Sequence, residues 1–327
     1  MTANAAATQE RTLIIKAKGG FGNRILSACT GVVIAQVTGR TPVIDWRDGE
    51  YLEAGENAYP PLFEDPVSVR PEAFDQRRDV VPALWQGRLD EHPTQIISDL
   101  FPDEHSNPLI YRRLSIDLAH PDVPSPLAVF WSYLPKMARV RRRAVRDPEF
   151  RGMSSSDLMR WALARHFRPN ARIRGAVDEI FAGRARPVVG VHIRYTDRKV
   201  SLDRIFREVT QLRRRMPEAP IFLATDNGGV QQQFRERFGN VFVIEKTLGD
   251  DDNSLHEHVV ADDPLLEAEN ALIDMWALAS CDWLIHSRHS TFSVAAALIG
   301  GIPRSRQRDI DRWNARVVVK RWVQTWA

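Results

Sequence analysis

Cysteine is scarce in this chain of 327 residues, which contains only two. Cys29 and Cys281 lie far apart in apolar segments, so we expect buried thiols and not a disulfide framework. The chain also lacks an apolar run near the roughly 20 residues that a membrane-spanning helix needs. Its first residues, MTANAAATQER, have no apolar core of a signal peptide. We therefore expect a soluble, cytoplasmic protein with no integral membrane segment.

A large excess of charge of one sign is also missing. The chain has 45 Lys and Arg against 42 Asp and Glu, a formal net charge of +3. A nucleic-acid-binding protein usually carries a denser basic stripe. The one dense basic run, RVRRRAVR at 139–146, is interpreted as the solvated face of a helix. We therefore expect no nucleic-acid partner.

Strand and helix patterns alternate in two separate parts of the chain. In the first, a β-branched strand at 12–18 leads through the glycine-rich stretch GGFGNR at 19–24 into a helix at 25–39 and a strand at 41–46. In the second, the expected strands are 187–194, 221–226, 241–246 and 283–287, and the expected helices are 203–216, 229–238, 264–280 and 290–299. Near-continuous apolar strands predict parallel sheets with helices on both faces.

These two parts predict the fold class, an α/β protein with two facing Rossmann-like domains and an interdomain cleft. The expected domains are residues 1–170 and residues 171–327. Ligands of open parallel sheets bind beyond the carboxyl ends of the strands. Polar residues at those ends are therefore the first candidates for function.

Three strands of the second part end in polar residues. His192 and Arg194 are two residues apart on one strand, so they point to the same face at its end. The next strand ends in Asp226, and the last one ends in His286 and Ser287. Parallel strands bring these ends to one edge of the sheet, and this shared edge is suited to an anion.

The helix after the last strand adds to this candidate site. Ser290 or Thr291 is a good N-cap for the apolar helix that follows. Backbone N–H groups at a helix N-terminus attract anions, and Arg194 would supply a fixed cation. Each residue alone has an ordinary structural explanation, such as a surface ion pair or a cap. Together they predict a site for a diphosphate.

Two weaker patterns favour ordinary structure when they are taken alone. Asp274 shares a helix face with Glu267 and Asn270, and spacing alone indicates a solvated face. The acidic loop that contains His256 and His258 lacks the spacing of a metal motif, so we expect a solvated loop.

The glycine-rich stretch offers a competing interpretation. Gly20-x-Gly22, with Asp45 at the end of the next strand, imitates a dinucleotide-binding fingerprint. However, Ile25 stands where a third glycine should let the helix pack closely on the strand. An NAD(P)-dependent oxidoreductase therefore stays open only as a weaker alternative.

Five motifs in register resemble those of a known family. GGFGNR, TGRTPVIDWRDGEYL, VVGVHIRYTDRKV, IFLATDN and ALIDMWALASCDWLIHSRHSTFS occur in the order seen in the nodulation-type (NodZ-like) fucosyltransferases. These enzymes are relatives of the α1,6-fucosyltransferases and, more distantly, of the protein O-fucosyltransferases. The resemblance spans residues 12 to about 300.

The resemblance implies a GT-B fold and transfer of L-fucose from GDP-β-L-fucose to a glycan hydroxyl with inversion. It implies no cofactor besides this donor substrate and no required metal. Arg194 would contact the donor β-phosphate, and Asn23 would lie near the reacting centre. The candidate donor-binding residues are His192 and Asp274 for the nucleoside, Ser290 and Thr291 for phosphate, and Gly20, Gly22 and Asp226 around them.

The sequence departs from the family pattern after the motif arginine. Many relatives carry a second basic residue there, but this chain has Tyr195, so Arg198, Lys199 or Arg288 would have to supply that phosphate contact. The proposed base of the core-fucosylation branch matches Asp203 only if one inserted residue is allowed. A non-catalytic GDP-sugar-binding protein therefore stays open as an alternative.

The acceptor is expected to dock on the N-terminal domain. Trp46, Tyr51 and Trp131 could stack on sugar rings there, although core packing is the better explanation for any one of them. The acceptor is an oligosaccharide or a glycolipid, and a chitin-type oligosaccharide, a lipopolysaccharide sugar and a small glycoside all remain open.

Overall fold

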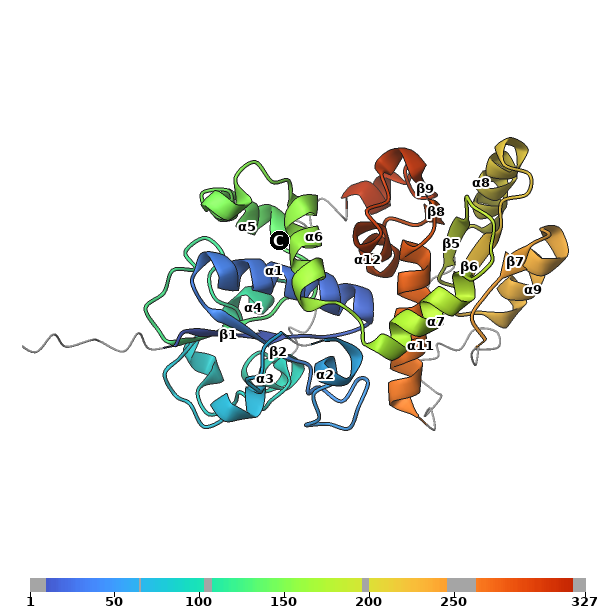
Figure 1. The fold of residues 1–327 in the computed structure, drawn as a ribbon. Helices are drawn as coiled ribbons and strands as arrows, with labels where there is room; N and C mark the ends of the chain where they lie inside the picture. Colours follow the sequence, from blue (N-terminus) through green and yellow to red (C-terminus); the bar gives the residue numbers. More distant parts are fainter. Residues whose placement is uncertain (1–9, 65, 103–107, 196–199, 246–262, 320–327) are drawn as a thin grey trace, which may run out of the picture.

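The computed structural model describes residues 10–64, 66–102, 108–195, 200–245 and 263–319. Within these residues the chain forms two parallel sheets that lie side by side, each with its own helices (Figure 1). The predicted α/β architecture with two parallel-sheet domains is confirmed. The domain boundary at residue 170 and the interdomain cleft stay predictions.

The N-terminal sheet has four parallel strands in the order β2-β1-β4-β3. Its strands are β1 (Thr12–Lys16), β2 (Thr41–Asp45), β3 (Val80–Val81) and β4 (Leu127–Phe130). All five residues of β1 are buried, because β1 lies between two neighbouring strands and helices cover the sheet. Burial on both faces explains the apolar residues Leu13, Ile14 and Ile15 in the middle of this strand.

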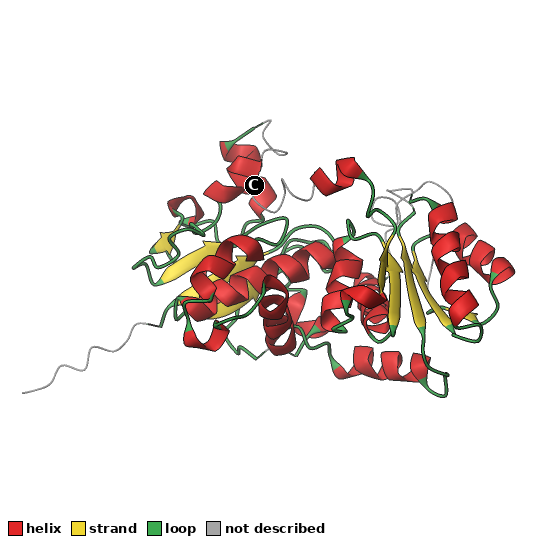
Figure 2. Ribbon diagram, turned by 90° about the horizontal axis from the view of Figure 1, so that it is seen from above, coloured by secondary structure: helices red, strands yellow, loops and turns green. Residues whose placement is uncertain are grey.

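The second sheet has five parallel strands in the order β7-β6-β5-β8-β9. Its strands are β5 (Val189–Ile193), β6 (Ile221–Thr225), β7 (Val241–Phe242), β8 (Trp283–His286) and β9 (Gln307–Asp309). Figure 2 shows helices on both sides of this sheet. The three predicted polar strand ends belong to β5, β6 and β8, which are direct neighbours.

The helices fill the connections between these strands. They are α1 (Phe21–Val37), α2 (Tyr59–Leu62), α3 (Pro93–Leu100), α4 (Pro108–Arg113), α5 (Met137–Ala144), α6 (Ser155–His166), α7 (Ala171–Phe181), α8 (Leu202–Arg215), α9 (Gly228–Arg237), α11 (Pro264–Ala279) and α12 (Thr291–Ile299). Short 3-10 turns lie at Pro71–Phe74, Ala83–Trp85, Pro148–Phe150 and Arg304–Arg306. No helix of the described residues is long and apolar enough to cross a lipid bilayer.

Helix α1 differs most from its prediction. It begins at Phe21 and not at residue 25, so Gly22, Asn23 and Arg24 belong to its first turn. The turn into the helix is made at Gly19, whose φ of +73° favours glycine. Since α1 contacts its own sheet, α5, α6 and α12, most of its residues are buried, and a buried helix lacks a polar stripe.

Several other elements are also shorter than predicted, and two of them are informative. Of the strand expected at 241–246, Val241–Phe242 pairs with β6, residues 243–245 form no strand, and residue 246 lies outside the described residues. The expected helix 290–299 begins at Thr291, after Ser290 as its N-cap.

The domains meet where α12 packs against α1 and α6 (Figure 1). A Cβ atom on Gly22 would lie 2.2 Å from the backbone nitrogen of Phe292. Only glycine allows two helix starts to approach so closely. One apolar core joins α1 of the first domain to α11 and α12 of the second.

Candidate functional site

The glycine-rich loop between β1 and α1 is held by Arg24. The Nε atom of Arg24 donates to the carbonyl oxygen of Gly19 at 2.5 Å, and its Nη2 atom donates to Oδ2 of Asp48 at 2.5 Å. Its guanidinium lies 5.0 Å from the ring centroid of Tyr51, and the residue is buried. Arg24 therefore fixes the path of the loop.

The starts of α1 and α12 meet in a direct contact between the two domains. The hydroxyl of Thr291 donates to Oδ1 of Asn23 at 2.7 Å. Gly20 is the N-cap of α1, Ser290 is the N-cap of α12, and neither helix has an acidic residue in its first turn. The positive ends of two helix dipoles thus lie together, and anions are stabilised at such ends.

The end of β5 lies next to this point. The ring of His192 stacks on Phe292, with centroids 5.2 Å apart and planes 19° apart. Arg194 follows β5 and is exposed. Phe292 also contributes the backbone that contacts Gly22, so the end of β5, the start of α12 and the glycine-rich loop form one continuous surface.

Asp226 fixes the chain just beyond Arg194. Its Oδ1 atom accepts a hydrogen bond from the backbone nitrogen of Tyr195 at 2.8 Å. This contact ties the end of β6 to the end of β5 and sets the direction in which the chain leaves Arg194. A direct contact of Asp226 with the donor stays a prediction.

The end of β8 is more buried than the sequence indicated. His286 is fully buried, and its Nδ1 atom lies 2.9 Å from Oγ of Ser293. The hydroxyl of Ser287 donates to the carboxylate of Asp311. As predicted, His286 ends β8 and Ser287 follows it. Both are bonded within the protein, so a part for this strand end in an anion site stays a prediction.

Asp274 and Asp203 lie in contrasting surroundings. Asp274 is 4% exposed on α11, which packs on α12, β5 and β6, so the solvated face that spacing alone indicated is wrong. Asp203 is exposed in the first turn of α8. Its assignment as the base stays a prediction.

Some candidates cannot be placed. Arg198, Lys199, His256 and His258 lie outside the described residues. Arg288 is exposed between β8 and α12, and its backbone nitrogen donates to Oδ1 of Asp309 at 3.1 Å. Over the described ranges there is no group of three or more metal-ligating side chains.

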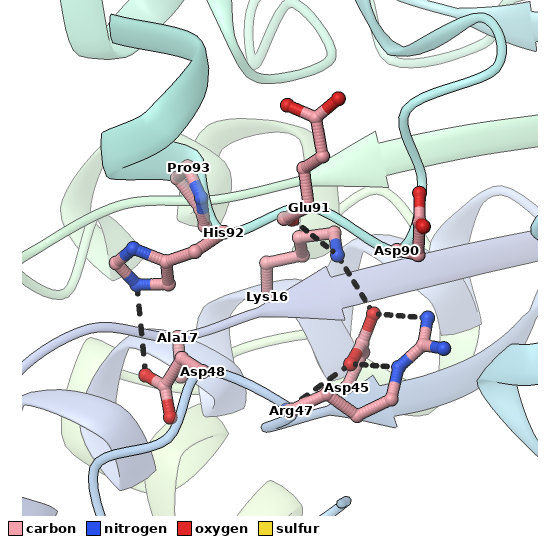
Figure 3. A pocket seen from close by; sticks show the side chains of 9 residues that line it. All are labelled: Lys16, Ala17, Asp45, Arg47, Asp48, Asp90, Glu91, His92 and Pro93. Carbon is pink, nitrogen blue, oxygen red and sulfur yellow. Dashed lines mark hydrogen bonds and ion pairs between the residues drawn. The ribbon is translucent and has the colours of Figure 1, made fainter. Parts of the chain in front are cut away.

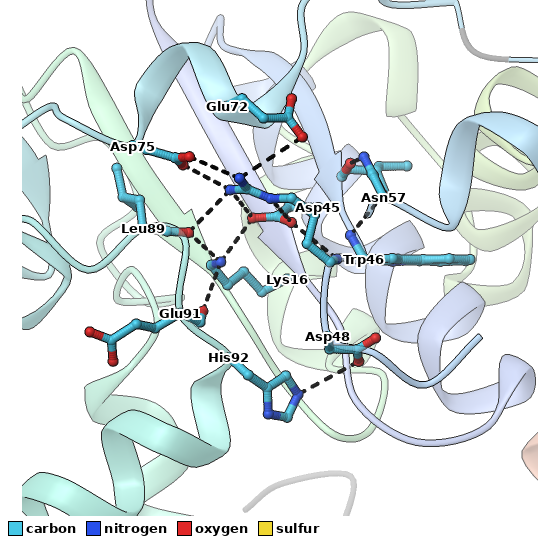
Figure 4. A network of polar contacts seen from close by, with 12 residues as sticks. Lys16, Asp45, Trp46, Asp48, Asn57, Glu72, Asp75, Leu89, Glu91 and His92 are labelled. Carbon is cyan, nitrogen blue, oxygen red and sulfur yellow. Dashed lines mark hydrogen bonds and ion pairs between the residues drawn. The ribbon is translucent and has the colours of Figure 1, made fainter. Parts of the chain in front are cut away.

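Asp45 is engaged in a buried charge network that sequence patterns did not reveal (Figure 4). Its carboxylate accepts from Lys16 Nζ at 2.8 Å and from Nε and Nη2 of Arg47 at 2.9 and 3.1 Å. Arg47 also binds Asp75, with Nη1 2.9 Å from Oδ2. Burial alone would raise the pKa of Asp45, but Lys16 and Arg47 outweigh it and hold that pKa below its usual value.

This network argues against the dinucleotide-binding interpretation. Asp45 would have to reach a ribose hydroxyl, yet it is 3% exposed and its oxygens already have cationic partners. Ile25, at the position of the missing glycine, is fully buried in the core.

A small pocket opens at the carboxyl ends of β1 and β2 (Figure 3). Its lining residues are Lys16, Ala17, Asp45, Arg47, Asp48, Asp90, Glu91, His92 and Pro93. His92 is the N-cap of α3, where its Nδ1 atom accepts from the backbone nitrogen of Thr94 at 3.2 Å, and its Nε2 atom lies 3.6 Å from Oδ2 of Asp48. Both ring nitrogens thus face protein groups, so His92 has a structural role.

The aromatic residues considered for sugar stacking are core residues. Trp46 and Trp131 are 1% exposed, and Tyr51 stacks on Phe21 with centroids 4.1 Å apart. Trp46 contacts Tyr59 among other aromatic rings. None of the three can offer a face to an acceptor.

Comparisons with known proteins agree with the motif order. The model of the family Nodulation protein Z (NodZ) matches residues 153–322. A nodulation protein Z of Azorhizobium caulinodans is 27% identical over 312 residues, which cover 86% of this chain and 87% of the relative. The nodulation protein Z of Bradyrhizobium diazoefficiens is 25% identical and covers 86% of this chain and 76% of its own.

Solved structures show the same similarity at the level of the fold. A NodZ α-1,6-fucosyltransferase crystal soaked with GDP-fucose is similar with a TM-score of 0.62 and 25% identity, covering 89% of this chain and 92% of that one. POFUT1 in complex with GDP-fucose has a TM-score of 0.54 at 14% identity, covering 93% and 98%. The architecture of this chain is therefore the GT-B fold.

Proposed function

Because this chain belongs to the nodulation protein Z family, we propose that it is a fucosyltransferase that transfers L-fucose from GDP-β-L-fucose to a hydroxyl group of a glycan acceptor. The observation that carries this proposal is the meeting of the α1 and α12 starts, joined by the hydrogen bond between Asn23 and Thr291, beside Arg194. A related NodZ α-1,6-fucosyltransferase was soaked with GDP-fucose in its crystal, which supports this donor.

The donor would lie across the surface formed by the end of β5, the start of α12 and the glycine-rich loop. Arg194, Ser290 and the N-terminus of α12 would neutralise the diphosphate. His192, supported by its stack on Phe292, and Asp274 on α11 would contact the nucleoside. Burial of Asp274 fits a selective contact, because a buried carboxylate needs well-placed donors.

The reaction would be a single displacement at the anomeric carbon. The acceptor oxygen forms a bond to this carbon on one face, while the bond to the β-phosphate oxygen breaks on the other and GDP leaves with the electron pair. The acceptor proton passes to a base, for which Asp203 is our candidate. Developing charge on GDP would be stabilised by Arg194 and by helix dipoles, so we propose that neither a metal nor a further cofactor is required.

Asn23 would lie near the reacting centre in this arrangement, next to Gly20 and Gly22. Its side chain is oriented by Thr291. Gly20 leaves room for close approach of the sugar, because among the described residues a Cβ atom there would have only the Tyr51 hydroxyl within 4 Å, whereas Gly22 lets the start of α12 approach. The acceptor, an oligosaccharide or glycolipid, would approach from the N-terminal domain. We place this reaction in the cytoplasm.

A ligand panel tests this function. Thermal unfolding of the protein would be followed with GDP-fucose, GDP-mannose, a UDP-sugar and NAD, since a ligand of the folded state raises the unfolding temperature. We expect stabilisation by GDP-fucose, and stabilisation by NAD alone would overturn the proposal. Release of GDP from GDP-fucose, with and without a chelator, then separates an enzyme from a protein that only binds the donor.

A further inference from the structure

The segment that follows β2 packs against the glycine-rich loop. We call residues 46–51, WRDGEY, the β2 loop. Because β2 is the parallel neighbour of β1, both loops leave the sheet at its carboxyl edge. The ring of Tyr51 stacks on that of Phe21, the first residue of α1. The hydroxyl of Tyr51 lies 3.9 Å from the position of a Cβ atom on Gly20. The β2 loop therefore contacts the turn into α1 directly.

Arg24 links the two loops through one guanidinium group. Its Nε atom donates to the carbonyl oxygen of Gly19 and its Nη2 atom donates to Oδ2 of Asp48, both at 2.5 Å. The side chain of Arg24 has no exposed surface, and that of Asp48 is 7% exposed. Among the described residues, Nη1 of Arg24 has no hydrogen-bond partner. Two hydrogen bonds, one to each loop, therefore orient this guanidinium.

Asp48 supplies the negative charge that the buried guanidinium needs. A second carboxylate, that of Glu50, lies farther away, with its Oε2 atom 3.9 Å from Nη2 of Arg24, and its side chain is 39% exposed. Water and salt screen an exposed charge more than a buried one. The same Oδ2 atom of Asp48 also faces Nε2 of His92 at 3.6 Å (Figure 3), and His92 is fixed as the N-cap of α3. Asp48 is therefore held in place from two directions of the chain.

Gly19 and Asn23 lie together in the turn that Arg24 holds. The position of a Cβ atom on Gly19 is 3.6 Å from Nδ2 of Asn23. The backbone nitrogens of Asn23 and Arg24 both donate to the carbonyl oxygen of Gly20, at 2.9 and 3.2 Å. A movement of the Gly19 peptide would therefore move the side chain of Asn23, which we place near the reacting centre.

We propose that Asp48 is a positioning residue of the transfer reaction. It acts through Arg24, which fixes the carbonyl of Gly19 and with it the side chain of Asn23, and it touches neither the donor nor the acceptor. This inference rests on the proposed function, because it concerns the same reacting centre.

Asp48→Asn tests this role, because asparagine keeps the size of the side chain and removes its charge. We expect the turnover of GDP-fucose, measured as release of GDP, to fall roughly 10- to 100-fold, since a displacement of about 1 Å can cost 100-fold in rate. The Michaelis constant and the affinity for GDP should stay close to those of the wild type, because a residue that does not touch the donor adds nothing to its binding. A loss of GDP affinity as large as the loss of turnover would instead assign Asp48 to donor binding.

A double variant separates positioning from stability. Asp48→Asn leaves the charge of Arg24 buried without its partner, and this lowers the unfolding temperature. The addition of Arg24→Met removes that charge as well and should restore stability, because replacing both members of a buried pair is often neutral. Turnover should nevertheless stay as low as in the single variant, since nothing then holds the carbonyl of Gly19. If turnover returns together with stability, Asp48 has a structural role only.

Coupling to Asn23 connects the effect to the reacting centre. In the background of Asn23→Ala, Asp48→Asn should cause little further loss of turnover, because the effects of residues that act as one unit are not additive. Wild-type turnover of Asn23→Ala, or the full effect of Asp48→Asn in its background, would contradict the inference.

Asp75→Asn is the matched control. Asp75 accepts from Nη2 and Nη1 of Arg47 at 2.8 and 2.9 Å, so it also neutralises a buried arginine. Arg47 bonds to Asp45 and not to Gly19, so Asp75→Asn should lower stability and keep wild-type turnover. A wild type that releases no GDP from GDP-fucose would overturn the proposed function and this inference together. An active wild type with unchanged turnover in Asp48→Asn would overturn the positioning role alone.

Discussion

Charged residues at the carboxyl edge of the N-terminal sheet are neutralised inside the protein, whereas charged residues at the edge of the second sheet reach its surface. At the ends of β1 and β2, Asp45 accepts hydrogen bonds from Lys16 and Arg47 at distances of 2.8–3.1 Å. At the end of β5, Arg194 is exposed and His192 is partly exposed. We call the first the closed edge and the second the open edge.

The difference shows that a charge at the end of a parallel strand is not by itself a sign of ligand binding. At the closed edge, the charged groups have a structural role. Lys16 Nζ also donates to the carbonyls of Leu89 and Glu91, so it fixes the segment that leads into α3. At the open edge, the polar groups that are bonded internally, such as His286, stabilise the backbone around those that are exposed. The exposure of a charged side chain therefore distinguishes a structural role, as at the closed edge, from a candidate ligand contact, as at the open edge.

Asp45→Asn should have the largest effect, and the effect should be on stability. It removes the carboxylate charge that neutralises Lys16, and breaking a buried ion pair lowers the free energy of unfolding by about 3–5 kcal/mol. The matched control is Asp79→Asn, whose partner Arg77 is exposed, and an exposed pair contributes at most about 1 kcal/mol. Urea unfolding of both variants measures the difference.

The pH dependence of unfolding gives a second measurement on the same variant. Because the folded-state pKa of Asp45 is below its usual value, its contribution is present above the unfolded value of about 4 and is lost as pH falls through the folded value. The wild type and Asp45→Asn should therefore converge in stability only below about pH 4. A constant difference down to strongly acidic pH would contradict the closed network.

Arg194→Ala should have the next largest effect, and here activity should change while stability does not. Loss of one electrostatic donor at a developing charge typically reduces the rate about 100- to 1000-fold. Release of GDP from GDP-fucose measures this rate, and Arg235→Ala, an exposed arginine on α9, is the control. If Arg194→Ala folds normally and keeps near-normal turnover, the open edge is not the donor site.

The sequence predicted the architecture well, because apolar strands separated by helices determine a parallel sheet and its carboxyl edge. It also identified the strand end with His192 and Arg194, since polar residues at the end of an apolar strand are visible in the sequence. Contacts across long separations were not visible. The bonds of Asp45 to Lys16, and of Asn23 to Thr291 over 268 residues, appear only when the chain is folded.

Burial of single residues was the other limit of sequence patterns. Asp274 has the helical spacing of a solvated face and is nevertheless buried, because α11 lies between α12 and the second sheet. The sequence predicted His286 as a polar strand end. In the fold its Nδ1 atom lies 2.9 Å from Oγ of Ser293, in the first turn of α12, and the ring is buried. A hydrophobic pattern shows that a helix has an apolar face, but not whether a second element covers its polar face.

Gly22→Ala tests whether the open edge needs the contact between the domains. The new Cβ would lie 2.2 Å from the backbone of Phe292, so the starts of α1 and α12 must move apart, at a cost of about 1–3 kcal/mol as in other overpacked sites. Gly175→Ala is the control, because nothing lies within 4 Å of its Cβ position on α7 and alanine favours a helix.

The two glycine variants should change the unfolding temperature in opposite directions. Gly175→Ala is expected to raise the unfolding temperature slightly and leave GDP-fucose affinity unchanged, whereas Gly22→Ala should lower both. If Gly22→Ala binds GDP-fucose like the wild type, close approach of the two helix starts is not needed at the donor site.

Thr291→Val should have the smallest effect and removes the hydrogen bond between the hydroxyl of Thr291 and Asn23. Valine keeps the shape of threonine but cannot donate to Oδ1 of Asn23, and one such hydrogen bond contributes about 0.5–1.5 kcal/mol. Since Asn23 is bonded across the domain contact, we expect a several-fold loss of transfer rate with a GDP affinity close to that of the wild type. A change in affinity without a change in rate would instead show that Thr291 acts on the diphosphate, so the ratio of the two effects decides whether this bond orients the reacting centre or holds the leaving group.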